Sequence, residues 1–257
     1  MKSRLLSITA LFLVSLISTP SFSQVAILDY MKVNPQQADE YLLLEKEWKK
    51  VHLERVKVGV IIGWYLYKVR FAGTGSPYQY VTISIYKQFD DSENLFFEGV
   101  FEKAWKNQDI QSLLDKTDQI RNQAKSEVFI WVDGTSIDFN DPAKFLYMNF
   151  ISVPQGEENK YIEIEKYSWK PMHEELQKTR QMASWNLWNL WFYTHNNYRY
   201  ITMNAFYEYD DIDSYNYSEI FQKVHQGKDL NMLMQNTNLT RISNKTELWE
   251  LIDYISK

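Results

Sequence analysis

Two series of residues in this sequence combine side chains that could do chemistry together. The first series, whose spacing places its members along one face of an α-helix, is Tyr41, Glu45, Trp48 and His52. The second has the same residue types in the same order: Tyr161, Glu165, Trp169 and His173. If these faces turn toward a sheet, a carboxyl group, an indole and an imidazole share a half-buried pocket. The imidazole could be a general base or a polar anchor, and desolvation would raise the carboxyl pKa.

The role of the two histidines stays open among three interpretations. A histidine one turn after a tryptophan on an amphipathic helix is often a packed, hydrogen-bonded core residue. The alternatives are a polar anchor in a ligand pocket and a catalytic group. Trp64 and Trp185 occupy matching positions further along the chain and join the candidate ligand-binding residues. The sequence assigns no catalytic residue.

Metal binding is not expected at these histidines. A helix chelates an ion through ligands three or four positions apart, and no good ligand stands at those distances from His52 or His173. His225 and Asp229 have a suitable spacing, but the matching position in the first part of the chain is Trp105. The chain also has no cysteine, which excludes thiol catalysis and cysteine-ligated metal centres. The sequence points to no cofactor.

Both series belong to a repeat that extends through most of the chain. A shift of 120 residues superimposes Glu45 on Glu165, and one extra residue then enters the second copy. After the following strand and loop the shift of 120 returns and holds to the end. The sequence therefore predicts two diverged copies of one unit, residues 24–140 and 141–257. The extra residue, with Pro171 nearby, predicts a bulge or kink in the second helix.

Each copy is predicted to contain the same elements in the same order. Strands are expected at 25–33, 63–70, 78–86 and 127–133, and at 145–153, 184–193, 198–207 and 247–253. Helices are expected near 36–58 and 157–182, and second helical stretches after Asp90-Asp91 and Asp210-Asp211. The order strand, helix, strand, strand, helix, strand is that of a ferredoxin-like unit. Helices cover one face of such a sheet, so we expect two sheets to cover each other's bare faces.

The sequence at this point resembles the dimeric α/β-barrel superfamily, with two units fused in tandem. The motifs that carry the resemblance are Glu-x-x-Trp-Lys-x-x-His at 45–52, Trp-Lys-Pro-x-His at 169–173 and Gly-Trp-Tyr-Leu at 63–66. They are similar to the antibiotic-monooxygenase, NIPSNAP-like and EthD-like branches. The resemblance implies an α+β fold in which two tandem ferredoxin-like (β-α-β-β-α-β) repeats form an intramolecular, barrel-like pseudo-dimer. Because those branches differ widely in activity, it implies architecture more than chemistry.

A short basic series also occurs in both copies. Its members are Thr117, Arg121 and Lys125, matched by Thr237, Arg241 and Lys245. The series could form the rim of an anion-binding site. The alternative is a set of solvated cations near a helix end, where positive charge suits the helix dipole.

The segment 185–191 alternates tryptophan, leucine and asparagine in a way that gives a strand two largely apolar faces. Trp185, Leu187, Asn189 and Trp191 fall on one face, and Asn186, Trp188 and Leu190 fall on the other. We expect one face to meet the helices and the other to meet the partner sheet. An aromatic platform for a ligand is the alternative to core packing.

The N-terminus has the features of a secretory signal peptide. Lys2 and Arg4 precede an apolar run from Leu5 to Ile17, and small residues at 21 and 23 predict cleavage before Gln24. The run is shorter than a membrane span needs, so we expect a periplasmic or secreted protein without an integral membrane segment. Removal of the two cations changes the formal net charge from −5 to −7, and such an acidic chain argues against nucleic-acid binding.

Three functions are consistent with these features. The aromatic content of 16% and the repeated Glu, Trp and His favour binding of a small aromatic or apolar ligand between helices and sheet. The resemblance implies the alternative, a cofactor-independent monooxygenase or isomerase, or a haem-handling enzyme. The third is an oligomeric scaffold. The sequence leaves the ligand, any reaction and the oligomeric state unassigned.

Overall fold

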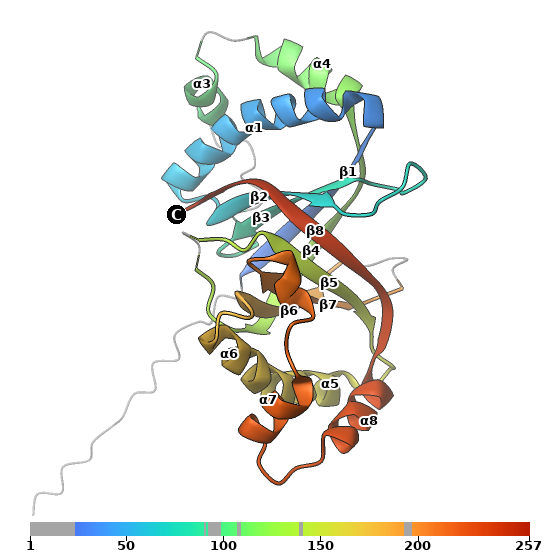
Figure 1. The fold of residues 1–257 in the computed structure, drawn as a ribbon. Coiled ribbons are helices and arrows are strands. Elements are labelled where there is room, and N and C mark those ends of the chain that lie inside the picture. Colours follow the sequence, from blue (N-terminus) through green and yellow to red (C-terminus); the bar gives the residue numbers. More distant parts are fainter. Residues whose placement is uncertain (1–23, 90, 92–98, 107–108, 139–140, 193–196) are drawn as a thin grey trace, which may run out of the picture.

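A computed structural model describes residues 24–89, 91, 99–106, 109–138, 141–192 and 197–257. The predicted signal peptide, residues 1–23, and Asp90 lie outside these ranges. Within them, eight antiparallel strands close into one barrel in the order β1-β3-β2-β8-β5-β7-β6-β4. The barrel and the helices around it make a mixed α/β fold (Figure 1).

The elements follow the same order in the two parts of the chain. The first half contains β1 (Val25–Val33), α1 (Ala38–Val58), β2 (Gly63–Val69), β3 (Tyr80–Tyr86), α3 (Val100–Ala104), α4 (Ile110–Ile120) and β4 (Arg121–Gly134). The second half contains β5 (Phe145–Ser152), α5 (Glu158–Ile164), α6 (Lys170–Lys178), β6 (Ser184–Leu190), β7 (Tyr200–Phe206), α7 (Tyr217–Val224), α8 (Leu230–Thr240) and β8 (Ile242–Ser256). A π-helical turn, Glu165–Trp169, joins α5 to α6.

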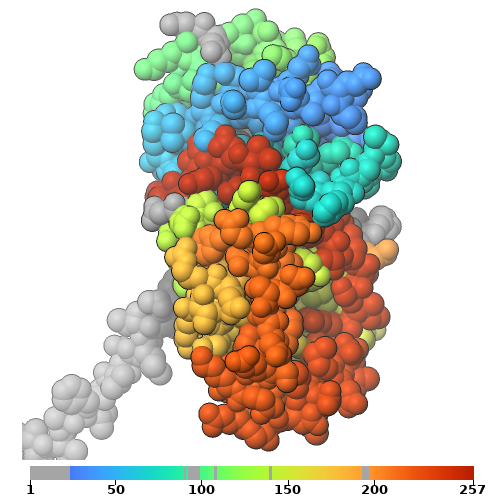
Figure 2. All heavy atoms as spheres, viewed as in Figure 1, coloured from blue at the N-terminus to red at the C-terminus, as the bar shows by residue number. Residues whose placement is uncertain are grey.

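The two halves are joined along two seams of the barrel. Strand β8 pairs with β2, and strand β4 pairs with β6. In Figure 2 the red atoms of β8 reach in among the blue and teal atoms of the first half. Reciprocal ion pairs reinforce the seams: Lys49 contacts Asp253, and Lys170 Nζ lies 2.8 Å from Asp133 Oδ1. The expectation of two sheets packed face to face is therefore confirmed only in part: the strands of the two halves join edge to edge into one closed barrel, whose inner face is covered.

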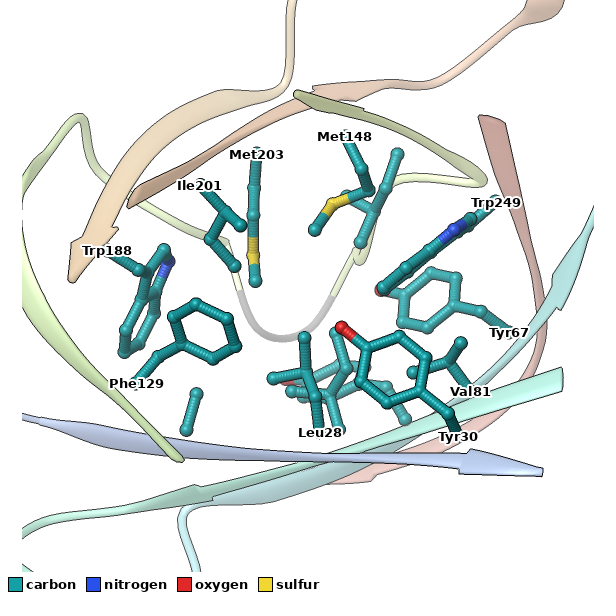
Figure 3. Packing of buried hydrophobic residues seen from close by; sticks show 14 of the residues in the cluster. Leu28, Tyr30, Tyr67, Val81, Phe129, Met148, Trp188, Ile201, Met203 and Trp249 are labelled. Atoms are coloured by element: carbon teal, nitrogen blue, oxygen red, sulfur yellow. The ribbon is translucent and has the colours of Figure 1, made fainter. Parts of the chain in front are cut away.

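The barrel interior is an apolar core built from both halves. Leu28, Tyr30 and Phe129 from the first half meet Trp188 and Trp249 from the second (Figure 3). Burying a large apolar side chain contributes about 1.5–3 kcal/mol each, and aromatic pairs prefer edge-to-face contacts such as those here. Tyr30 meets Trp249 edge to face with ring centroids 6.1 Å apart. Each half contributes to this one core, so the halves depend on each other for stability.

The helices cover the outer faces of the barrel on opposite sides. Helices α1, α3 and α4 lie over the first half, and α5 to α8 lie over the second (Figure 1). The alternation of strand β6 separates its two faces as the sequence predicted. Trp185 and Leu187 face the helices, whereas Trp188 and Leu190 face the barrel interior. The tryptophan-rich segment is thus packed mainly as core.

The closing strands are much longer than predicted. The expected ranges 127–133 and 247–253 extend to Arg121–Gly134 and Ile242–Ser256. Apart from Ala124 and the exposed Ile242, the first residues of both strands are polar and mostly exposed, so no apolar alternation marks them. Pairing with β1 holds the first one: Arg121 lies opposite Val33, and Asn122 lies opposite Lys32.

The extension of these strands overturns both interpretations of the basic series. Thr117 lies in the last turn of α4. Arg121 is the first residue of strand β4, and Lys125 lies within that strand. Lys125 Nζ donates to the hydroxyl of Tyr198 at 2.7 Å and to Glu127, and Lys245 makes the reciprocal bond to Tyr78 at 2.6 Å. These lysines are neither a free anion-binding rim nor solvated cations at a helix end. They connect the two halves.

The predicted bulge is present as the π-helical turn of the second half. The extra residue is absorbed between Glu165 and Trp169, whereas α1 is continuous over the matching positions. The Nε2 of His225 lies 2.9 Å from the carbonyl oxygen of Ser168 and donates to it. The first half has a corresponding bond. Trp105, at the position of His225, donates through Nε1 to the carbonyl oxygen of Glu47, at the position of Ser168, over 3.1 Å. His225 therefore supports the helix.

The prediction for Asp210-Asp211 is confirmed in part: Asp211 belongs to a capping box and accepts from the backbone N–H of Glu208, but the N-cap is Glu208. This pair lies within a short 3₁₀ turn, Tyr209–Ile212, instead of opening a longer helix. Asn216 caps α7, and Asp229 caps α8 by accepting from the backbone of Asn231. Asparagine and aspartate are both strong N-cap residues, so the composition of this region offered several possible starts.

The helices in the described part of the chain include none with the length and apolar character that a membrane span requires.

Candidate functional site

The carboxyl groups of the two series lie between the long helix and the outer face of the sheet. Glu45 and Glu165 are buried, and each forms an ion pair with an arginine at the start of a closing strand. The partners are Arg121 and Arg241. The sequence analysis did not connect these arginines to the glutamates. The separation of 76 residues, which is the same in both copies, was the signal that could have done so.

The tryptophans of the series are fixed by hydrogen bonds to the second helical segment. Trp48 Nε1 donates to Thr117 Oγ1 at 3.0 Å, and Trp169 Nε1 donates to Thr237 Oγ1 at 3.0 Å. The arginines lie over the same indoles, with the guanidinium carbon of Arg241 5.9 Å from the Trp169 ring centroid. Such cation–π contacts add to the ion pairs. Glutamate, arginine, tryptophan and threonine therefore form one rigid unit in each half.

The histidines stack on the strand tryptophans that the sequence grouped with them. The His52 and Trp64 rings are 4.8 Å apart with an interplanar angle of 12°, and those of His173 and Trp185 are 5.3 Å apart at 18°. Tyr41 and Tyr161 lie fully buried on the same helices. The structure thus brings the ten candidate residues together into two equivalent clusters.

The two clusters differ at the histidine. In the first half, Nη1 of Arg55 lies 3.1 Å from Nδ1 of His52, and Nη2 of Arg55 donates to the hydroxyl of Tyr86 at 2.7 Å. The position matching Arg55 in the second half is Leu176, a packed core residue. As a result, the Nδ1 atom of His173 is buried without a hydrogen-bond partner.

The two clusters also differ at one residue of the sheet, which is charged in the first half and neutral in the second. Asp29 faces the first cluster, and the positive charges of Arg121 and Arg55 act on its carboxyl group, although burial raises its pKa overall. Its counterpart in the second half is the neutral Asn149, which donates to Thr202 Oγ1 at 3.0 Å. An aspartate and an arginine in the first half are therefore replaced by an asparagine and a leucine in the second.

The second cluster opens into a pocket of about 530 Å³. Four of the predicted residues, Glu165, Trp169, His173 and Trp185, form part of its wall. The sheet contributes amide and hydroxyl groups, and the α7–α8 side contributes tyrosines. The other lining residues are Tyr147, Asn149, Thr202, Asn204, Phe206, Ile212, Asp213, Tyr215, Tyr217, Leu230, Asn231, Met234 and Arg241. This volume falls within the range of small-molecule sites.

Burial controls the protonation of the site. Burial, together with the smaller effect of the positive charge of Arg241, lowers the pKa of His173 to about 3. Burial also raises the pKa of Glu165, against the opposing effect of Arg241. At neutral pH His173 is therefore a neutral imidazole, which has one nitrogen that donates and one that accepts. A group with so low a pKa is a weak base near neutrality.

The described residues offer no evident metal centre. No group of three or more histidine, aspartate or glutamate side chains among them is arranged to hold an ion. The His225 and Asp229 pair, which had suitable spacing, is used otherwise. His225 bonds to the helix backbone, and Asp229 caps α8.

The fold is shared with solved structures at low sequence identity. A candidate monooxygenase from Fusobacterium nucleatum subsp. nucleatum is 12% identical, with 93% of this chain and 96% of that one covered and a TM-score of 0.56. A candidate monooxygenase from Lactobacillus acidophilus is 9% identical, with 91% and 96% covered and a TM-score of 0.56. A candidate chlorite dismutase is 10% identical, with 90% and 95% covered and a TM-score of 0.51.

These likenesses concern the fold, a mixed α/β chain whose eight antiparallel strands close into one barrel. No protein-family profile matches the sequence, and no curated protein matches it. At 9–12% identity the structural likeness concerns the fold alone. The chemistry must therefore be argued from the pocket.

Proposed function

We propose that this protein binds a small aromatic or apolar ligand in the pocket of the second half. The observation that carries the proposal is the buried Nδ1 atom of His173, which has no partner and belongs to a residue in the pocket wall. Leaving a buried polar atom unpaired costs about 1–3 kcal/mol. A ligand with one complementary polar group would satisfy His173 while its ring packs against the surrounding aromatic side chains.

The comparison of the two halves supports the second half as the binding half. In the first half, Arg55 satisfies His52 and carries its charge between helix and sheet. In the second half, Leu176 and Asn149 stand at the positions of Arg55 and Asp29, so the pocket lining is mostly neutral. A neutral, aromatic lining with a few polar groups suits a neutral aromatic molecule.

Cofactor-independent oxygenation or isomerisation is the alternative for the same pocket. Such reactions begin by removing a proton from the substrate, and an efficient base has a pKa near the working pH. His173 has a pKa of about 3, and Glu165 is paired with Arg241. These properties favour binding and positioning over proton abstraction.

Haem is a poor fit to the residues of this pocket. An axial ligand must have room beside its ring nitrogen for the iron and the whole macrocycle, whereas the buried Nδ1 atom of His173 leaves room for a small polar group only. The arginine in the wall, Arg241, is already paired with Glu165 and so is not free for a propionate group. Titration with haem should therefore give no Soret shift that depends on His173.

Binding is tested by calorimetry with phenol and indole as probes. We expect His173→Phe to weaken phenol binding about tenfold, because the buried polar partner is lost. The matched control is His52→Phe, which should leave the affinity unchanged. Equal effects of the two variants, or no binding of either probe to the unmodified protein, would refute the proposal.

We further propose that the halves are two tandem ferredoxin-like repeats, 24–140 and 141–257. The common order of elements and the matched Glu–Arg, Trp–Thr and His–Trp contacts support this. The motifs favour the antibiotic-monooxygenase, NIPSNAP-like or EthD-like branches. Superposition of the halves in an experimental structure would test the duplication, and strands that fail to coincide would count against it.

Export is proposed on the sequence of residues 1–23 alone. The basic start, the short apolar run and the small residues before Gln24 support cleavage and a periplasmic or secreted location. The test is expression of the full chain in a bacterium with N-terminal sequencing of the periplasmic fraction. A mature protein that retains residues 1–23 would contradict this proposal.

A further inference from the structure

A second cavity lies directly beside the proposed pocket. It has a volume of about 520 Å³ and runs between the β2–β3 hairpin of the first half and the surface of the second. The two cavities share three wall residues, Tyr147, Ile212 and Asp213. The two cavities therefore adjoin at these residues, and the second is called the hairpin cleft below.

Phe71 lines the hairpin cleft with an exposed side chain and an unfavourable backbone conformation. Its side chain is 80% exposed, and its φ of 61° lies in the left-handed region. This conformation is rare for a bulky residue and is strained. The turn is held in place, since Arg70 N donates to the carbonyl of Leu248 at 2.8 Å and the Arg70 side chain pairs with Glu250. The guanidinium of Arg70 lies over one side of the ring, 5.8 Å from its centroid, and the strained backbone presents the rest of the ring to solvent, which suggests a further partner.

Other exposed rings continue the path from Phe71 to the proposed pocket. Tyr209 is 54% exposed and lines the hairpin cleft, Tyr147 is 36% exposed and lines both cavities, and Tyr217 is 41% exposed and lines the pocket. Single exposed rings need no explanation, but several exposed rings that line two adjoining cavities are consistent with a binding surface. Among the charged groups of the cleft wall, Arg70 and Glu247 are paired with Glu250 and Lys245, and Asp213 is exposed to solvent.

We infer that the ligand is an elongated, uncharged molecule with two aromatic units. One unit lies in the pocket against His173, and the other lies in the hairpin cleft against Phe71. This inference rests on the proposed function and names the class of ligand for that site. The cleft contributes ring contacts, and paired charges in its wall give a charged second unit little advantage.

Calorimetry with the full protein tests the inference, using phenol as a one-ring probe and 4-phenylphenol as a two-ring probe. We expect 4-phenylphenol to bind about tenfold more tightly, because the second ring gains contacts in the cleft. Phe71→Gly should reduce this advantage to less than about threefold and leave phenol binding unchanged. Glycine adopts positive φ without strain, so this variant should fold.

The control is Phe192→Gly, because Phe192 is also exposed, at 57%, but does not line the cleft. It should keep the full advantage of the two-ring probe. If phenol binds but 4-phenylphenol gains nothing, or if Phe71→Gly keeps the tenfold difference, the elongated ligand is refuted while the proposed function stands. If neither probe binds, the proposed function is refuted and this inference with it.

Discussion

The low pKa of His173 predicts a specific dependence of stability on pH. Burial lowers this pKa from 6.5 to about 3 in the folded protein, whereas in the unfolded chain it is close to 6.5. The unfolded state therefore binds a proton more tightly than the folded state. The contribution of neutral His173 to stability is fully present above pH 6.5 and is lost as the pH falls toward 3.

The size of the effect follows from these two pKa values. At pH 5 the unfolded imidazole is almost fully protonated and the folded one is almost fully neutral. Protonation then stabilises the unfolded state by about 1.5 pH units at 1.36 kcal/mol each, which is about 2 kcal/mol. This energy of about 2 kcal/mol depends mainly on the pKa of the histidine in the unfolded chain, as long as its pKa in the folded protein is below about 4.

The measurement is urea unfolding of the unmodified protein and of His173→Gln at pH 7.5 and pH 5. Loss of the ring stack on Trp185 shifts the variant's stability at both pH values, so the informative quantity is the difference between them. The unmodified protein should lose about 2 kcal/mol more on acidification than the variant. His52→Gln should act in the same direction, because burial and the charge of Arg55 lower the pKa of His52. Parallel losses in the protein and in His173→Gln would refute the reasoning.

Three further perturbations test the site and its frame. Arg241→Met should cost about 3 kcal/mol in urea unfolding, because it leaves Glu165 buried without its cation; adding Glu165→Gln should recover part of this loss, and a double variant that is less stable than the single one would contradict the pairing. Trp169→Phe should cost about 1 kcal/mol through loss of the 3.0 Å bond to Thr237, and an unchanged unfolding midpoint would show that the bond is not formed. Deletion of Tyr167, which is 71% exposed within the π turn, should give a continuous helix like α1; a crystal structure that retains the π turn would contradict this.

The regular elements could be predicted from the sequence where burial imposes a pattern. The first strand begins and ends at the predicted residues, Val25 and Val33. The extra residue between Glu165 and Trp169 was enough to predict a helical irregularity. The beginnings of β4 and β8 could not be predicted in this way, because Arg121 to Ser126 show no apolar alternation. The strand conformation of these segments depends on pairing, of β4 with β1 and of β8 with β5, which is a tertiary effect.

The site was predicted on the helix side and, on the sheet, at Trp64 and Trp185 only. The stripe from Tyr41 to His52 follows from helical spacing, so its members could be grouped without a structure. Arg121 could not be placed, because its role depends on a helix-to-strand boundary that the sequence hid. Arg55 was visible as part of the same helix, but only its burial beside Tyr86 shows that it satisfies His52. The difference between the two halves therefore became apparent only in three dimensions.

Closure of the barrel by a single chain has a genetic consequence. When two identical subunits build such a barrel, every substitution appears at both sites at once. Here a codon change at Arg55 or Asp29 leaves Leu176 and Asn149 untouched. One half can thus become fully packed and stabilise the fold while the other keeps an open pocket. Selection for ligand affinity then need not oppose selection for stability.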